Sequence, residues 1–114
     1  MDLLSLFDGQ DDRRSVAAGE AVFSEGDPGD TMFVVLDGSV ELHSGGTATA
    51  TVGPGELFGE MSLIDDEPRS LAAVAATDSV LAELDERRFL FLVNETPMFA
   101  LHVMGVMADR LRSA

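Results

Sequence analysis

Glu60 and Arg69 are the two residues of this sequence whose types and spacing suggest ligand-binding chemistry. They lie in the stretch GPGELFGEMSLIDDEPRSLAAVAA at 53–76, where Gly59 leaves the backbone bare beside Glu60 and a proline restricts the loop before Arg69. A guanidinium can grip phosphate oxygens as a fork, and a carboxylate can accept a hydrogen bond from a sugar hydroxyl. We therefore expect a site for a ligand that carries both a phosphate and a hydroxyl group.

Arg69 is isolated in a strongly acidic chain. The sequence has 21 acidic residues against seven arginines and no lysine, which gives a formal net charge of −14. No other arginine lies between Arg14 and Arg87. Proteins that bind nucleic acid or an anionic membrane surface need a cationic footprint, so the composition argues against both of these partners.

The length and the terminal sequence narrow the class of protein further. A chain of 114 residues has the size of one domain. Without cysteine it can form no disulfide and no thiolate metal site. Residues 1–12 carry acidic rather than basic flanks, unlike a signal peptide, and no apolar run reaches the ~20 residues of a membrane span. We expect a cytoplasmic location.

Between residues 17 and 84 the sequence alternates short apolar runs with glycine turns. Strands of about five residues with a turn every ten or so are typical of a small antiparallel roll, barrel or sandwich. The predicted strands include 20–24, 31–38, 39–43, 47–52 and 79–84.

The first 18 residues are expected to form a short arm that packs its apolar side chains against the body of the domain. One apolar helical turn is expected to contain Leu3, Leu4, Leu6 and Phe7. The residues expected to end this turn are Asp8, Gly9, Asp11 and Asp12.

Two helices are expected after the last strand, at about 85–95 and 97–112. Asp85 is suited to cap the first helix. Thr96 and Pro97 are suited to cap and begin the second. The apolar residues expected to share one face of the first helix are Phe89, Leu92 and Val93.

The second of these helices is apolar almost all round between residues 98 and 108. One face is expected to cover the strands, and the remaining apolar surface indicates a partner. That partner is expected to be a second copy of the chain or a separate output protein. The residues expected at this surface are Met98, Leu101, Met104 and Met107.

The stretch FGEMSLIDDEPRS resembles the phosphate-binding cassette of cyclic nucleotide-binding domains, written F-G-E-[LM]-[AS]-L followed by P-R-[ST]-A. Upstream, FSEGDPGDTMFVVLDGSVEL is similar to the second to fourth strands of this family, and the resemblance covers roughly residues 17–112. It implies a mainly β, double-stranded β-roll of about eight short strands, with two C-terminal helices and a short N-terminal helical remnant. It also implies a single domain, 1–114, that binds a cyclic purine mononucleotide (cAMP or cGMP) as a ligand-sensing regulatory module.

The resemblance assigns a role to individual residues of the cassette. Glu60 and the backbone of Gly59 would bind the ribose 2′-hydroxyl, and Arg69 and Ser70 would bind the cyclic phosphate. A short helix that begins near Met61 would direct backbone N–H groups at the same phosphate. The residues expected at the ligand are Leu42, which would line the purine pocket, and Gly59, Glu60, Met61, Ser62, Arg69, Ser70 and Leu71.

Leu71 departs from the family pattern, which usually has a small alanine at this position. Its bulk can narrow the pocket, so an alternative function is a degenerate cassette that binds no nucleotide and serves as a dimerisation or interaction scaffold. Nothing that resembles an output domain follows Leu111, so we expect any signal to pass through the oligomeric state or a separate protein.

Other chemistry has little support in the sequence. Glu60 and Arg69 can also be interpreted as a surface ion pair, and Ser70 as a strand-edge serine that bonds to local backbone. His43 and His102 lack neighbours at metal-ligand spacing, so we expect no metal and no cofactor. An enzyme is not expected, because no set of nucleophile, base and orienting group can be assembled. The acidic residues at 65–67 are expected to form a solvated turn.

Overall fold

The computed structural model describes residues 1–7 and 13–113. Its strands are β1 (Arg13–Val16), β2 (Ala21–Phe23), β3 (Thr31–Asp37), β4 (Val40–Ser44), β5 (Thr47–Val52), β6 (Leu57–Phe58), β7 (Ala72–Ala75) and β8 (Ser79–Asp85). Its helices are α1 (Leu3–Leu6), α2 (Glu60–Asp65), α3 (Glu86–Glu95) and α4 (Met98–Ser113).

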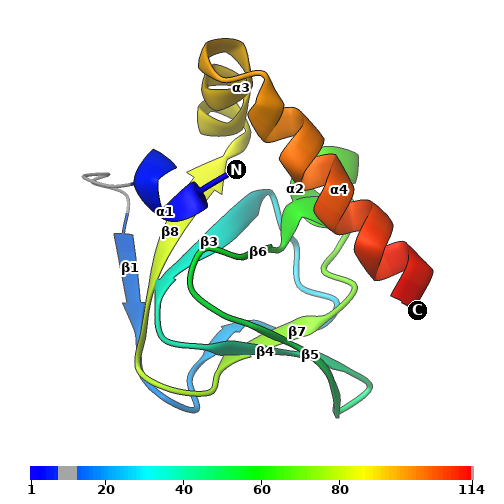
Figure 1. The fold of residues 1–114 in the computed structure, drawn as a ribbon. Helices are drawn as coiled ribbons and strands as arrows, with labels where there is room; N and C mark the ends of the chain where they lie inside the picture. Colours follow the sequence, from blue (N-terminus) through cyan, green and yellow to red (C-terminus); the bar gives the residue numbers. More distant parts are fainter. Residues whose placement is uncertain (8–12, 114) are drawn as a thin grey trace.

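The strands form two facing four-stranded antiparallel sheets, with the orders β1-β8-β3-β6 and β2-β7-β4-β5. The helices α1, α3 and α4 lie on the side of the first sheet that faces away from the second sheet (Figure 1). The expected β-roll with C-terminal helices is therefore confirmed.

The central strand β3 is buried on both faces. Successive side chains of a strand point to opposite faces, which places Met32 and Val34 in one apolar cluster and Phe33 and Val35 in another. The first cluster also receives side chains from α1, α3 and α4, whereas the second receives side chains from β4 and β7 of the facing sheet. The apolar run of β3 is continuous because both of its faces are buried.

β1 is a strand that the sequence pattern does not predict. Its sequence RRSV has no apolar alternation, and of its four residues only Val16 is buried. Antiparallel pairing with β8 places Arg14 opposite Leu81 and Val16 opposite Ser79. A distant partner in the sequence, rather than a local pattern, therefore determines this strand.

The N-terminal arm packs against the body of the protein through Leu3 and Phe7, which are almost fully buried. α1 is a single turn, and the carboxylate of Asp2 caps it by accepting a hydrogen bond from the backbone N–H of Leu4 at 3.1 Å. The residues expected to end this turn, Asp8, Gly9, Asp11 and Asp12, lie outside the described residues.

α3 begins as expected, with the Asp85 carboxylate accepting a hydrogen bond from the Arg88 backbone N–H at 2.8 Å. The predicted face of α3 packs on the first apolar cluster: Leu92 is buried in it, and Phe89 and Val93 pack against it.

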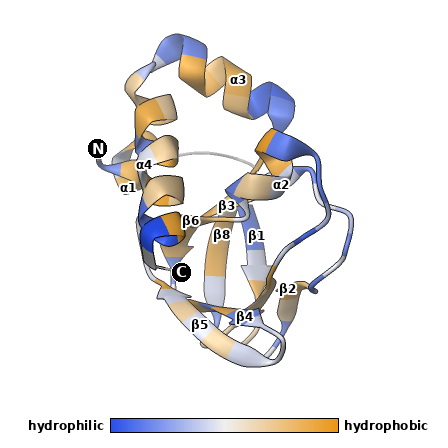
Figure 2. Ribbon diagram, turned by 90° about the vertical axis from the view of Figure 1, so that its right-hand side faces the viewer, coloured by the Kyte–Doolittle hydropathy of each residue, from blue (hydrophilic) through white to orange (hydrophobic). Residues whose placement is uncertain are grey.

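α4 begins at Met98, one residue later than predicted, and covers the sheet with Phe99 and Val103, both buried. The Phe99 ring contacts Phe7 and Phe89, with ring centroids 6.1 and 5.7 Å apart. Hydrophobic residues nevertheless run along both α3 and α4 (Figure 2). Among the described helices none is long and apolar enough by itself to cross a membrane; α3 and α4 pass that test only as a pair, and they are bent by 119° where they meet.

Replacing Asp85 with alanine is expected to lower the free energy of unfolding by about 1 kcal/mol, because α3 loses its N-cap. Urea unfolding followed by circular dichroism measures this change. Asp85→Asn keeps an oxygen that can accept the Arg88 N–H bond, so it should stay close to the wild type. Equal destabilisation by the two substitutions would show that capping is not what Asp85 contributes.

Candidate functional site

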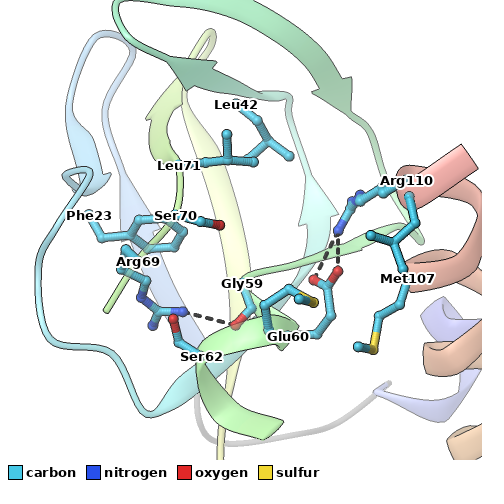
Figure 3. Close-up of a pocket in the computed structure, with 12 residues that line it drawn as sticks. Phe23, Leu42, Gly59, Glu60, Ser62, Arg69, Ser70, Leu71, Met107 and Arg110 are labelled. Atoms are coloured by element: carbon cyan, nitrogen blue, oxygen red, sulfur yellow. Dashed lines mark hydrogen bonds and ion pairs between the residues drawn. The ribbon is translucent and has the colours of Figure 1, made fainter. Parts of the chain in front are cut away.

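All eight residues predicted at the ligand line one cavity of about 200 Å³. The cavity lies between α2, the 66–71 loop, strands β2 and β4, and the C-terminal half of α4 (Figure 3). Sequence reasoning missed the remaining lining residues, which are Phe23, Met107, Arg110 and Leu111.

Gly59 is required at the start of α2 for two reasons. Its φ is 78°, in the left-handed region that favours glycine. A Cβ at this position would also lie 3.1 Å from Nη1 of Arg69 and 3.4 Å from the rings of Phe23 and Phe33. The absent side chain therefore lets the backbone of the cassette approach the arginine closely, and α2 follows directly at Glu60.

The Arg69 side chain is buried beside the cavity, although both of its sequence neighbours are exposed. Its Nη1 donates to the carbonyl of Gly59 at 2.9 Å, and its Nη2 donates to the Thr31 hydroxyl at 3.0 Å. The guanidinium carbon lies 4.2 Å from the centroid of the Phe23 ring, a distance at which a cation is attracted to the ring face. These contacts hold the guanidinium in one place.

The charge of Arg69 is surrounded by carboxylates. Burial lowers the pKa of the guanidinium, and the negative charges of Asp30, Glu83, Asp27 and Glu60 oppose this shift. Because arginine keeps its proton in proteins, the cavity contains a fixed and partly desolvated cation.

Glu60 pairs with an arginine of α4. Its carboxylate is almost fully buried and accepts from Nη1 of Arg110 at 2.7 Å and 2.9 Å, while Nη2 of Arg110 donates to the carbonyl of Leu57 at 2.5 Å. Figure 3 shows this pair across the cavity from Arg69. The interpretation of Glu60 and Arg69 as a surface ion pair is therefore wrong, since both are buried and each has other partners.

Although Arg69 is isolated from other arginines in the sequence, Arg110 is a second cation at the cavity. It lies 50 positions after Glu60 in the sequence, so no local spacing could connect the two residues. Its position at the cavity follows from the way α4 packs on the first apolar cluster. The sequence pattern predicts that one face of α4 covers the strands, but it does not predict where along the sheet each residue lies.

Leu71 does not fill the cavity. Its side chain is half-buried and packs against the apolar cluster between the two sheets. It lies beside Leu42, which is buried in the same cluster (Figure 3). Leu71 is therefore part of the wall at the apolar end of the cavity, which Met107 and Leu111 of α4 also line.

The predicted partner surface on α4 is smaller than the sequence suggests. Met98, Leu101 and Met104 are 60%, 58% and 55% exposed. Met107 instead packs against the first apolar cluster and lines the cavity. It therefore belongs to the cavity wall and not to the exposed face of α4.

The two histidines and the acidic residues 65–67 lie on separate elements: His43 is on β4, His102 is on α4, and Asp65 ends α2. His43 is half-buried, and its Nε2 lies 3.4 Å from a Glu41 oxygen. The acidic residues 65–67 form an exposed turn, in which the Asp65 carboxylate accepts from the backbone N–H of Glu67 at 3.0 Å. Within residues 1–7 and 13–113, no group of three histidine or acidic side chains could hold a metal ion.

This fold and cavity are those of a cyclic nucleotide-binding domain, and comparison with known proteins identifies the family. The family profile described as "Cyclic nucleotide-binding domain" matches residues 13–96. The chain therefore belongs to the cyclic nucleotide-binding domain family.

Two curated relatives and one solved structure illustrate this membership. The chain is 41% identical over 107 residues to the cyclic AMP receptor protein of Thermus thermophilus, covering 90% of this chain and 50% of that protein. It is 38% identical over 78 residues to a cAMP-dependent protein kinase regulatory subunit of Eremothecium gossypii, covering 68% of this chain and 17% of that subunit. The crystal structure of the Thermus thermophilus catabolite activator protein superimposes with a TM-score of 0.81 at 36% identity, covering 94% of this chain and 58% of that one. The chain thus spans half or less of the length of these curated relatives.

Replacing Arg110 with alanine is expected to lower the free energy of unfolding by about 2 kcal/mol, because the buried Glu60 carboxylate loses its charged partner. Denaturant unfolding measures the loss. Arg112→Ala removes an exposed arginine of the same helix and should change stability by less than about 0.5 kcal/mol. Equal effects of the two substitutions would mean that the ion pair does not hold α4 in place.

Proposed function

We propose that this chain is a cytoplasmic sensor domain that binds a cyclic purine mononucleotide, cAMP or cGMP, in the cavity beside α2. The observation that carries the proposal is that a buried cation, Arg69, and a buried carboxylate, Glu60, lie on opposite sides of one open cavity. The names of the relatives support a cyclic nucleotide as the ligand, since one is a cyclic AMP receptor and another a cAMP-dependent kinase subunit.

Each part of such a nucleotide has a suitable counterpart in the cavity. Arg69, with Ser70 beside it, supplies positive charge and donors for the cyclic phosphate. Glu60 supplies an acceptor for the ribose 2′-hydroxyl. The purine would occupy the apolar end of the cavity, where the lining side chains are Leu42, Leu71, Met107 and Leu111.

The ion pair between Glu60 and Arg110 supports a route from the ligand to α4. A ribose hydroxyl that donates to Glu60 acts on the same carboxylate that holds α4 through Arg110. Nucleotide binding would draw the cassette inward, α3 would follow, and α4 would close over the base. The open cavity beside Leu71 supports this proposal over a scaffold that has lost its ligand.

Calorimetric titration of nucleotide-free protein with cAMP and with cGMP is expected to show a dissociation constant in the micromolar range or tighter for at least one of them. Arg69→Ala should abolish this binding, because the phosphate loses its charged donor. Arg87→Ala removes an exposed arginine of α3, so binding should be retained. Absence of heat and of any shift in melting temperature with either nucleotide would contradict the proposed function.

The exposed face of α4, formed by Met98, Leu101 and Met104, is proposed as the surface that transmits the signal, through a second copy of this chain or a separate output protein. Large exposed apolar side chains grouped on one helix are typical of a protein interface.

For the version with a second copy, sedimentation at micromolar protein concentration is expected to show a dimer, and Leu101→Glu should shift it to monomer. Ala48→Glu introduces the same charge at an exposed position of β5, in the second sheet and outside the exposed face of α4, and should leave the dimer intact. A monomer in every case, with and without nucleotide, would contradict the dimer and leave a separate output protein as the partner.

A further inference from the structure

The guanidinium of Arg69 is enclosed on its Nε edge by the backbone of Gly29. Nε is buried and has no hydrogen-bond partner in the part of the chain that the structure describes. A Cβ on Gly29 would lie 2.2 Å from Nε, 2.6 Å from Cζ and 2.7 Å from Cδ of Arg69. The arginine therefore occupies the space in which a side chain at position 29 would lie.

Two further groups fix the orientation of the same guanidinium. The Phe23 ring lies on one face, 4.2 Å from the guanidinium carbon. The Thr31 hydroxyl accepts a hydrogen bond from Nη2 at 3.0 Å. Gly29 lies near the end of the β2–β3 loop, and Thr31 is the first residue of β3. Both lie 38 positions or more before Arg69 in the sequence.

These contacts leave a defined set of donors for a ligand. A guanidinium has five N–H groups in a fixed planar fork. The carbonyl of Gly59 takes one from Nη1, the Thr31 hydroxyl takes one from Nη2, and Gly29 covers the Nε edge. These protein acceptors leave one N–H on each terminal nitrogen, and a guanidinium N–H can donate a charge-assisted hydrogen bond to a phosphate oxygen.

The backbone of the loop reinforces this arrangement. The Arg69 N–H donates to the carbonyl of Asp27 at 2.8 Å, and the Arg69 carbonyl accepts from the N–H of Gly26 at 2.8 Å. The main chain of Arg69 is thus paired with the same loop that encloses its side chain.

We infer that Gly29 and Thr31 are positioning residues for phosphate recognition, which fix the Arg69 guanidinium so that one N–H of each terminal nitrogen faces the ligand. This inference rests on the proposed function and extends it to a loop outside the cassette. Neither residue lines the cavity, so both act through Arg69 and not by touching the nucleotide.

Gly29→Ala tests the positioning role of Gly29 without straining the backbone at this position. The φ of Gly29 is outside the left-handed region, so alanine can adopt the local backbone. The added methyl group instead displaces the flexible end of Arg69. Binding of cAMP is expected to weaken by roughly tenfold or more, the factor that corresponds to losing a charge-assisted hydrogen bond.

The matched control is Gly53→Ala, where φ is also outside the left-handed region and a Cβ would meet a Glu56 carboxylate oxygen at 3.4 Å. This variant should bind cAMP like the wild type. Thr31→Val removes the acceptor at nearly constant volume and should weaken binding by roughly threefold to tenfold, whereas Thr31→Ser keeps a hydroxyl and should restore it.

A second readout separates positioning from a general loss of structure. The two diastereomers of adenosine 3′,5′-cyclic monophosphorothioate each replace one exocyclic oxygen with sulfur, a weaker acceptor. A fixed guanidinium binds them with unequal affinities, so the ratio of the two affinities should fall toward one in Gly29→Ala and Thr31→Val. A purely structural defect would weaken both diastereomers equally and leave the ratio unchanged.

The outcomes distinguish this inference from the proposed function. If the wild type binds cAMP and both variants match it in affinity and in diastereomer ratio, the inference is wrong and the proposed function stands. If both variants bind weakly with an unchanged ratio, Gly29 and Thr31 are structural and the inference is likewise wrong. If the wild type binds no cyclic nucleotide, the proposed function fails and the inference fails with it.

Discussion

Burial of one guanidinium in a chain of net charge −14 is the constraint on which the cavity depends. A charge removed from water is costly unless its surroundings replace the lost solvation. For Arg69 those surroundings are the carbonyl of Gly59 at the start of α2, the hydroxyl of Thr31 at the start of β3, and the ring of Phe23. The same contacts that stabilise the charge also fix the guanidinium at the wall of the cavity, so stability and recognition have a common structural origin.

The second buried charge extends this arrangement to the C-terminal helix. Glu60 begins α2 and is paired with Arg110, while Phe99 and Val103 of the same α4 cover the sheet. α4 is therefore held by apolar packing, with Phe99 and Val103 buried in its N-terminal half and Met107 packed further along, and by an ion pair at its C-terminal half. Breaking such a pair leaves a buried carboxylate unsatisfied, so a change at Glu60 acts directly on the C-terminal half of α4.

The sequence predicted the parts of the fold that have a local signature. The apolar run of β3, the cap at Asp85 and the cassette between Gly59 and Leu71 are all read from residues close together in the chain. β1 could not be predicted this way, because RRSV carries no strand pattern and forms a strand by pairing with β8. The assignment of Met107 to the exposed face of α4 was wrong for a related reason. The helical pattern gives the period of α4 but not its rotation against the sheet.

The site shows the same limit. The eight residues of the predicted site lie together because seven of them come from one stretch of sequence and Leu42 from an adjacent strand. Arg110, Gly29 and Thr31 lie 50, 40 and 38 positions from the residues they contact, as the sequence numbers show. Contacts of this range depend on how the loop and α4 pack, which no spacing in the sequence encodes.

The most direct test of the account is the ¹H–¹⁵N spectrum of the arginine side chains during titration with cAMP. The Nε–H signals of Arg69 and Arg110 are expected to shift and saturate together, because one ligand reaches Arg69 through its phosphate and Arg110 through Glu60. The exposed Arg13 of β1, a strand that takes no part in the proposed movement, should remain unchanged and serve as the internal reference. Movement of neither signal at saturating cAMP would contradict the claim that this cavity binds a cyclic nucleotide and couples it to α4.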